Sequence, residues 1–266
     1  NPHTITVYDF GQMENGDLYL VMELLNGLPL SQLTKQKKGL DAMRAMGIIE
    51  QCLRSLKEAH DHNIVHRDLK PDNIFLTERD SKQDFVKVLD FGIAKITEES
   101  DSLRAGEDLT QTGAACGTPH YMAPEQASGE TIDCRTDIYS LGVVLFSMLT
   151  GRHLFEGSSA VHVLSKHVYE APPSLRAVAQ SQHYSKELED FFLKCVKKKP
   201  EQRFQNTEEM HAEVEKFIAG EFPLYGDGIL EDDVATQMVP TDSDLKSIYD
   251  QSQKDIDQTG IIDPER

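Results

Sequence analysis

The chain has 266 residues, of which 39% are hydrophobic, and its 45 acidic against 27 basic side chains give a formal net charge of −18. This composition is typical of a globular domain with a sizeable core, and the negative charge argues against nucleic acid as a partner. The longest apolar stretch, residues 138–149, is shorter than the roughly 20 residues that a bilayer requires. We therefore expect no membrane span in this chain.

Two antiparallel strands are predicted near the start of the chain. Residues 5–11 and 18–27 are rich in β-branched and aromatic side chains, and the dipeptide Asn15-Gly16 between them is a strong hairpin signal. Short strands are also expected beside the loops in residues 64–77 and 85–95.

A long amphipathic helix is predicted between these two regions. Met46, Ile49 and Leu53 recur at helical spacing behind Asp41, which is a suitable N-cap residue. We expect this helix to end at Asn63, just before the next predicted strand.

The second half of the chain is predicted to be helical. Residues 138–149 are apolar nearly all round, which indicates a helix buried inside the domain. Further helices are expected at about residues 158–168, 185–197 and 207–219. Strands followed by helices predict an α+β domain that is dominated by helix.

The C-terminal segment differs from the body of the chain. Residues 221–266 hold 12 acidic side chains against 3 basic ones, and scattered Gly, Pro, Ser and Gln interrupt any apolar period. This composition is typical of a disordered acidic linker or tail.

The spacing of the cysteines indicates the cellular compartment. Cys52, Cys116, Cys134 and Cys195 lie far apart, without the paired spacing of a disulfide framework or a zinc site. Such a spread is typical of reduced thiols and predicts a cytoplasmic location. We interpret Cys116 as an ordinary buried thiol.

The segment HRDLKPDN, residues 66–73, carries side chains that phosphoryl transfer requires. Transfer to a hydroxyl needs a carboxylate to orient and deprotonate that hydroxyl, oxygen ligands for a metal ion, and cations for the transferred charge. Asp68 is the candidate carboxylate, and Lys70 is the candidate cation. Asn73 and Asp90, the latter in the sequence DFG, are candidate Mg²⁺ ligands.

Further motifs follow HRDLKPDN in a fixed order. They are DFG at residues 90–92, GTPHYMAPE at 117–125, DIYSLG at 137–142 and Arg203 in KKPEQRF. On these motifs the chain resembles the protein kinase family over roughly residues 1–220.

The resemblance is to one branch of that family. Lys70 and Thr118 fit the serine/threonine branch, and the sequences LTQTG and YMAPEQ are similar to those of bacterial (Hanks-type) serine/threonine kinases. This implies transfer of the γ-phosphoryl group of ATP to serine or threonine of protein substrates, with Mg²⁺ as cofactor. Thr118 then joins Asp68, Lys70, Asn73 and Asp90 as a catalytic residue.

The resemblance also implies an adenine pocket. Met22 would be the gatekeeper, while Glu23 and Leu25 would hold adenine through their backbone groups. Phe75 and Leu89 would form the floor of the pocket.

Three residues are expected to have structural roles. The resemblance implies a buried ion pair between Glu125 and Arg203, which would join the end of the activation segment to the helical core. Asp137 would hold the backbone of the turn at His66 and Arg67.

The polar stretch from residue 95 to 117 corresponds to the activation segment of the family. Thr110 and Thr112 within it are expected to be autophosphorylated by the complete enzyme. The added negative charge would pair with Arg67 and Lys95 and would order the segment. A kinase–kinase dimer for autophosphorylation in trans is the candidate assembly.

Some family features are not found in the sequence. A glycine-rich loop, a phosphate-binding lysine and a helix with a pairing glutamate would precede Asn1. We therefore interpret residues 1–25 as a remnant of the small lobe and hinge strand, 26–220 as the large lobe and 221–266 as the linker. Without the missing groups we expect this chain alone to be inactive.

Two interpretations remain open. The chain is either a fragment of a longer active kinase or a non-catalytic kinase-like interaction module. The intact Asp68, Asn73 and Asp90 favour the fragment. The location expected for it is the cytoplasm, including the cytoplasmic part of a longer, membrane-anchored protein.

Overall fold

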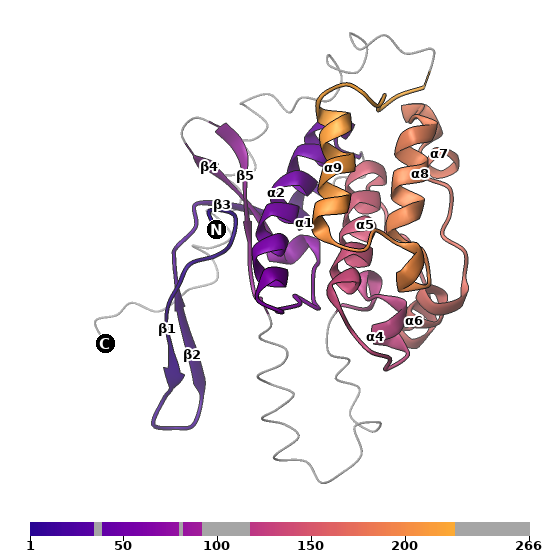
Figure 1. Ribbon diagram of the computed structural model, residues 1–266. Coiled ribbons are helices and arrows are strands. Elements are labelled where there is room, and N and C mark those ends of the chain that lie inside the picture. The colour runs from indigo at the N-terminus through magenta and orange to yellow at the C-terminus, as the bar shows by residue number, and fades with distance from the viewer. Residues whose placement is uncertain (35–38, 80–81, 92–117, 227–266) are drawn as a thin grey trace. The chain divides into compact units, whose positions relative to one another are not determined.

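The computed structural model describes residues 1–34, 39–79, 82–91 and 118–226. Within them, small β-sheets in the first part of the chain are followed by a larger set of helices (Figure 1). This order of elements confirms the expected α+β fold, dominated by helix.

Strands β1 (Val7–Gln12) and β2 (Leu18–Met22) form an antiparallel hairpin, as predicted. Gly16 in the connecting turn has a φ of 91°, which glycine adopts readily because it lacks a Cβ atom. Large apolar side chains are exposed along this hairpin, namely Val7, Tyr8, Phe10, Met13, Leu18, Val21 and Met22. A two-stranded sheet buries little of its own apolar surface and is marginally stable by itself.

The second sheet contains the antiparallel strands β3 (Gly27–Pro29), β4 (Ile74–Arg79) and β5 (Lys82–Val88), in that order. The N-terminal segment lies beside β5, because Thr4 forms a parallel bridge with Val88. Gly27 is required where β3 meets β4, since a Cβ atom there would lie 2.0 Å from the carbonyl oxygen of Leu76.

Helix α2 (Ala42–Asp61) confirms the predicted long amphipathic helix. Asp41 caps it by accepting a hydrogen bond from the backbone nitrogen of Arg44 at 2.9 Å. The helix ends at Asp61 rather than at Asn63, because Asn63 adopts a left-handed φ of 58°.

Helix α5 (Cys134–Thr150) is the centre of the helical core. All of its residues from Thr136 to Thr150 are buried, in agreement with the apolar run that predicted a buried helix. It packs against α2 and against α9 (Thr207–Ile218), and α2 and α9 run side by side (Figure 1).

The remaining helices complete this part of the fold. They are α1 (Leu30–Thr34), α4 (Pro124–Ala127), α6 (Ala160–Tyr169), α7 (Leu175–Val178) and α8 (Lys186–Cys195). Short 3-10 turns occur at η1 (Pro71–Asn73), η2 (Pro119–Tyr121), η3 (Gln180–Gln182) and η4 (Pro200–Gln202). Helices α6, α8 and α9 confirm the three helices that we predicted after residue 157. None of the helices in the described ranges has both the length and the apolar character that a membrane span needs.

The chain packs back onto the helices after α9. Ser185 Oγ donates a hydrogen bond to the carbonyl oxygen of Pro223 at 2.6 Å, and Tyr225 Oη donates one to Asp41 Oδ2 at 2.8 Å. Residues 227–266 lie outside the described residues, so the acidic linker remains a prediction.

Candidate active site

The HRD segment forms a turn that a buried carboxylate holds in place. Asp137 on α5 is fully buried and accepts hydrogen bonds from the backbone nitrogens of His66 and Arg67, both at 2.9 Å. Arg67 has a left-handed φ of 69°, which turns the chain sharply at this point. His60 near the end of α2 adds a third contact, from Nε2 to Asp137 Oδ2 at 2.7 Å. The turn is thereby anchored on the central helix.

Asp68 is the centre of a polar cluster next to this turn. Its Oδ2 atom lies 2.7 Å from Lys70 Nζ and 3.2 Å from Asn73 Nδ2. Asn73 Nδ2 also donates to the backbone oxygen of Asp68 at 2.9 Å, and Pro71 begins the turn η1 that places Asn73. The Asp68 side chain remains 30% exposed, so a substrate hydroxyl can approach it.

Strand β5 brings Asp90 to the same cluster. The backbone nitrogen of Leu89 donates to the carbonyl oxygen of Asn73 at 2.9 Å, and the Leu89 oxygen lies 2.7 Å from His66 Nε2. Asp90 follows with a left-handed φ of 60° and is exposed. The backbone hydrogen bond from Leu89 to Asn73 thus places the segment that carries Asp90 beside the segment that carries Asn73.

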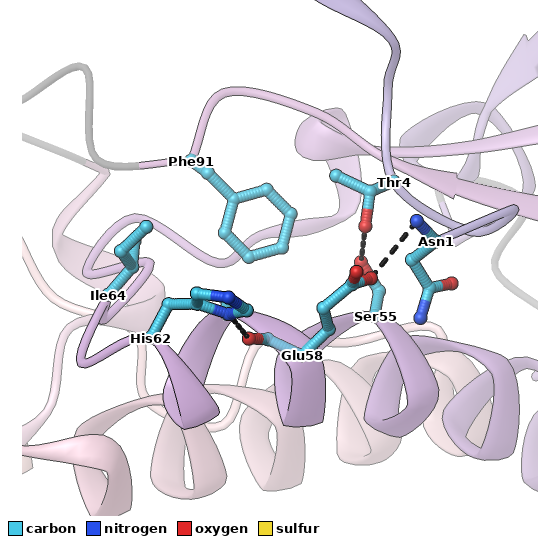
Figure 2. Close-up of a pocket in the computed structure, with 8 residues that line it drawn as sticks. Asn1, Thr4, Ser55, Glu58, His62, Ile64 and Phe91 are labelled. Carbon is cyan, nitrogen blue, oxygen red and sulfur yellow. Dashed lines mark hydrogen bonds and ion pairs between the residues drawn. The ribbon is translucent and has the colours of Figure 1, made fainter.

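Phe91 separates this cluster from a cavity of about 270 Å³. Its ring packs against His66, with ring centroids 4.8 Å apart, and also lines the cavity. Figure 2 shows the ring above α2, near His62 and Ile64. None of the lining residues is expected to bind adenine, so this cavity is distinct from the expected nucleotide pocket.

Helix α4 connects the core with the HRD turn. Glu125 and Arg203 form a buried ion pair with a nitrogen–oxygen distance of 2.7 Å. Burial acts to raise the pKa of Glu125, but the Arg203 guanidinium outweighs it and holds the pKa below its ordinary value. The neighbouring Gln126 donates from Nε2 to the carbonyl oxygen of Arg67 at 2.7 Å.

The residues expected to bind adenine come from both sheets. Met22 ends β2, and Glu23 and Leu25 follow it. Phe75 lies on β4, and Leu89 directly follows the adjacent strand β5. Met22 is exposed and the other four are half-buried.

The structure describes the expected catalytic residue Thr118 but only part of the expected regulatory residues. Thr118 is the residue before η2 and is half-buried. Lys95, Thr110 and Thr112 lie outside the described residues, so the phosphorylation of the two threonines and the pairing of their phosphates with Arg67 and Lys95 remain predictions.

Three residues that contact the site were missed by the sequence reasoning: His60, Gln126 and Lys87. Their partners, Asp137, Arg67 and Glu23, lie 77, 59 and 64 residues away in the sequence. Motif spacing cannot identify such pairs. The available signals were indirect, since Gln126 directly follows Glu125 and Lys87 lies shortly before DFG.

Comparison with known proteins points to the same family as the motifs at this site. The protein kinase domain family matches residues 1–214. The chain belongs to the protein kinase family. It is 42% identical over 215 residues to the serine/threonine-protein kinase pkn3 of Myxococcus xanthus, a match that covers 81% of this chain and 39% of that kinase. It is 40% identical over 228 residues to the serine/threonine-protein kinase PknB of Mycolicibacterium smegmatis, covering 84% of this chain and 34% of that kinase.

The chain therefore spans well under half the length of these two kinases. Among solved structures, the PknI kinase domain of Mycobacterium tuberculosis is similar, with a TM-score of 0.61 and 22% identity. That match covers 81% of this chain and 72% of the other, and at this identity it shows the kinase fold alone.

Proposed function

We propose that this chain carries the catalytic large lobe of an ATP- and Mg²⁺-dependent serine/threonine protein kinase. The observation that carries the proposal is one cluster, in which Asp68 contacts Lys70 and Asn73 while Leu89 joins Asp90 to the same segment. The two kinases described above, which share about 40% of the matched residues, support the serine/threonine assignment.

Asp68 would orient the hydroxyl of the acceptor serine or threonine and take its proton. Among the described residues, Lys70 and Asn73 both donate to Oδ2, and these two contacts restrict the orientation of the carboxylate. Lys70 also places a positive charge beside the position of the transferred group, where it would stabilise developing negative charge.

The oxygen donors fit Mg²⁺, which prefers carboxylate and amide oxygens. The Asn73 amide nitrogen is engaged by Asp68, so the amide oxygen on the other side of the group is the atom that would bind the metal. Asp90 provides an exposed carboxylate one residue after Leu89, whose backbone nitrogen donates to the carbonyl oxygen of Asn73. When bound, Mg-ATP supplies the phosphoryl group and the metal charge that neutralises its oxygens.

The exposed hairpin supports the assignment of residues 1–25 to a kinase small lobe. Apolar side chains such as Tyr8 and Phe10 are 68% and 51% exposed, which is unfavourable for a surface that remains in water. We propose that further β-structure covers them in the functional protein. Glu23 and Leu25 would then hold adenine against Phe75 and Leu89.

Substrates, assembly and location follow from the same proposal. The acceptors would be serine and threonine of other proteins and of the activation segment, the latter in a kinase–kinase dimer. A cytoplasmic location is supported by the free thiols of Cys52, Cys134 and Cys195. The expected linker would connect the domain to other parts of the protein, and it would start after Tyr225, because Pro223 and Tyr225 are hydrogen-bonded to the domain.

Incubation of the full-length protein with Mg-ATP and a generic protein acceptor tests the proposal. We expect phosphoserine or phosphothreonine on the acceptor and on the protein itself, and almost none with the Asp68→Asn variant. A folded wild-type protein that transfers no phosphate would support the alternative function, a non-catalytic kinase-like interaction module.

A further inference from the structure

Lys87 is buried on β5 beside the expected nucleotide site. Its side chain is 11% exposed, and Nζ lies 2.6 Å from Glu23 Oε1 and 3.3 Å from the carbonyl oxygen of Thr4. Lysine is seldom buried unless its charge is paired. The close contact with Glu23 is therefore a specific charge pair within the fold.

The Glu23 carboxylate joins three segments of the chain. Oε1 accepts hydrogen bonds from Lys87 Nζ and from the backbone nitrogen of Thr6, the latter at 2.8 Å, while the Glu23 nitrogen donates to the Thr6 oxygen at 2.9 Å. Burial acts to raise the pKa of Glu23, but the hydrogen bonds from Lys87 and Thr6 outweigh it and lower the pKa. Glu23 therefore connects the hinge, the N-terminal segment and β5.

Lys87 lies between the two ends of the expected nucleotide site. In the β4–β5 register it is directly opposite Phe75, so both side chains project from the same face of the sheet. Two residues later in the chain, Leu89 makes the backbone hydrogen bond to Asn73, and Asp90 follows. The strand thus links the expected adenine floor with the expected metal ligands.

We propose that Lys87 and Glu23 form a positioning pair, which sets the separation between the hinge and Asp90. The inference rests on the proposed function, because one Mg-ATP must meet the hinge with its adenine and Asp90 through the Mg²⁺ on its phosphates. A shift of β5 relative to the hinge would misalign these two contacts, so that the nucleotide would bind more weakly because it could not make both well. In this role Lys87 acts through its ion pair with Glu23.

The Lys87→Met variant of the full-length protein tests this role, because it removes the charge and keeps an unbranched side chain. We expect the Kd for Mg-ADP and the KM for Mg-ATP to rise about tenfold, while kcat changes less than about threefold. Glu23→Gln should weaken binding in the same way. The double variant, Lys87→Met with Glu23→Gln, should bind Mg-ADP about as tightly as the single variant with the lower affinity, because the two residues act as one unit.

Lys87→Arg keeps the positive charge and should recover part of the affinity. If Lys87→Met does not fold, Glu23→Gln and Lys87→Arg still provide the comparison. Unchanged or tighter Mg-ADP binding by the folded charge-removing variants would overturn the positioning role.

Arg44→Met is the matched control. Arg44 pairs with Asp84 on the same strand β5, at 2.7 and 2.8 Å and with exposures of 20% and 24%, but it comes from α2 rather than from the hinge. We expect both Arg44→Met and Lys87→Met to lower stability, and only Lys87→Met to weaken nucleotide binding. An equal loss of affinity in the control would overturn the positioning role but leave the kinase function standing. A folded wild-type protein that binds no Mg-ADP would overturn both.

Discussion

Arg203 and Glu125 are 78 residues apart in the sequence and face each other in the core through two hydrogen bonds of 2.7 and 2.8 Å. The Arg203 side chain is fully buried, and it also donates to the backbone carbonyls of Lys197, Lys198 and Arg135. Thr136 Oγ1 also donates to Glu125 at 2.8 Å. A buried ion pair with this many hydrogen bonds is costly to disrupt from one side, because the remaining charge would have no partner.

The Arg203→Met variant should therefore be strongly destabilised. We expect the free energy of unfolding, measured by urea denaturation, to fall by about 3–5 kcal/mol. Arg203→Lys should lower the free energy of unfolding by less, because lysine keeps the positive charge. It should still be destabilised, because lysine cannot make the two parallel hydrogen bonds to Glu125. Combining Arg203→Met with Glu125→Gln should cost less than the sum of the single changes. A loss below about 1 kcal/mol for Arg203→Met would contradict this account.

Substitutions at Asp68 and Asp90 should have separable effects in the full-length protein. Asp68→Asn removes the proposed acceptor of the hydroxyl proton, so kcat should fall by about 10²–10⁴-fold with little change in the Kd for Mg-ADP. Asp90→Asn removes a proposed metal ligand and should weaken Mg²⁺-dependent nucleotide binding as well as turnover. Calorimetry and steady-state kinetics measure both quantities. Near-normal turnover by Asp68→Asn would reject its role as general base.

His167 should make the stability of the domain depend on pH. It is fully buried on α6, and its Nδ1 atom lies 2.9 Å from Tyr139 Oη. Burial, and next the charge of Lys198, lower the pKa of His167 from 6.5 to about 3. Because the folded-state pKa is below the unfolded one, the stabilisation is complete above pH 6.5 and is lost as the pH falls toward 3.

This contribution can be isolated by comparing the wild-type protein with His167→Gln. Between pH 6 and pH 4 the free energy of unfolding of the wild type should fall more steeply, by about 1.4 kcal/mol per pH unit for the one extra proton. Parallel curves for the two proteins would show that His167 takes up no proton on unfolding.

Autophosphorylation of Thr110 and Thr112 should activate the full-length enzyme. Each phosphate adds about −1.5 to −2 charges, which would pair with Arg67 and Lys95 and order the activation segment. Arg67 is adjacent to Asp68 in the chain, so this order would reach the catalytic carboxylate. Mass spectrometry should find both sites modified in active protein, and changing both to alanine should lower activity. Full activity of the alanine variant would show that the switch does not exist.

The local elements could be predicted from the sequence because their causes are local. Asp41 as an N-cap, Asn15-Gly16 as a hairpin turn and the apolar run on α5 each act within a few residues of chain. The HRD and DFG motifs likewise identified Asp68, Asn73 and Asp90 as candidates, because transfer chemistry restricts which side chains can serve. The end of α2 was misplaced, since it depends on the left-handed conformation of Asn63.

Contacts between residues far apart in the sequence could not be predicted from local sequence patterns. The contact of Asp137 with His60 and the pairing of Lys87 with Glu23 join residues that are 77 and 64 positions apart, and no motif indicated them. The contacts of Asp137 with the turn at His66 and the ion pair of Glu125 with Arg203 were expected, but only from the family resemblance. They form only after α5 and β5 have packed, and hydrophobic burial rather than local spacing drives that packing. Amino-acid types therefore indicated the chemistry of the protein, whereas the contacts of His60, Gln126 and Lys87 became visible only in the folded chain.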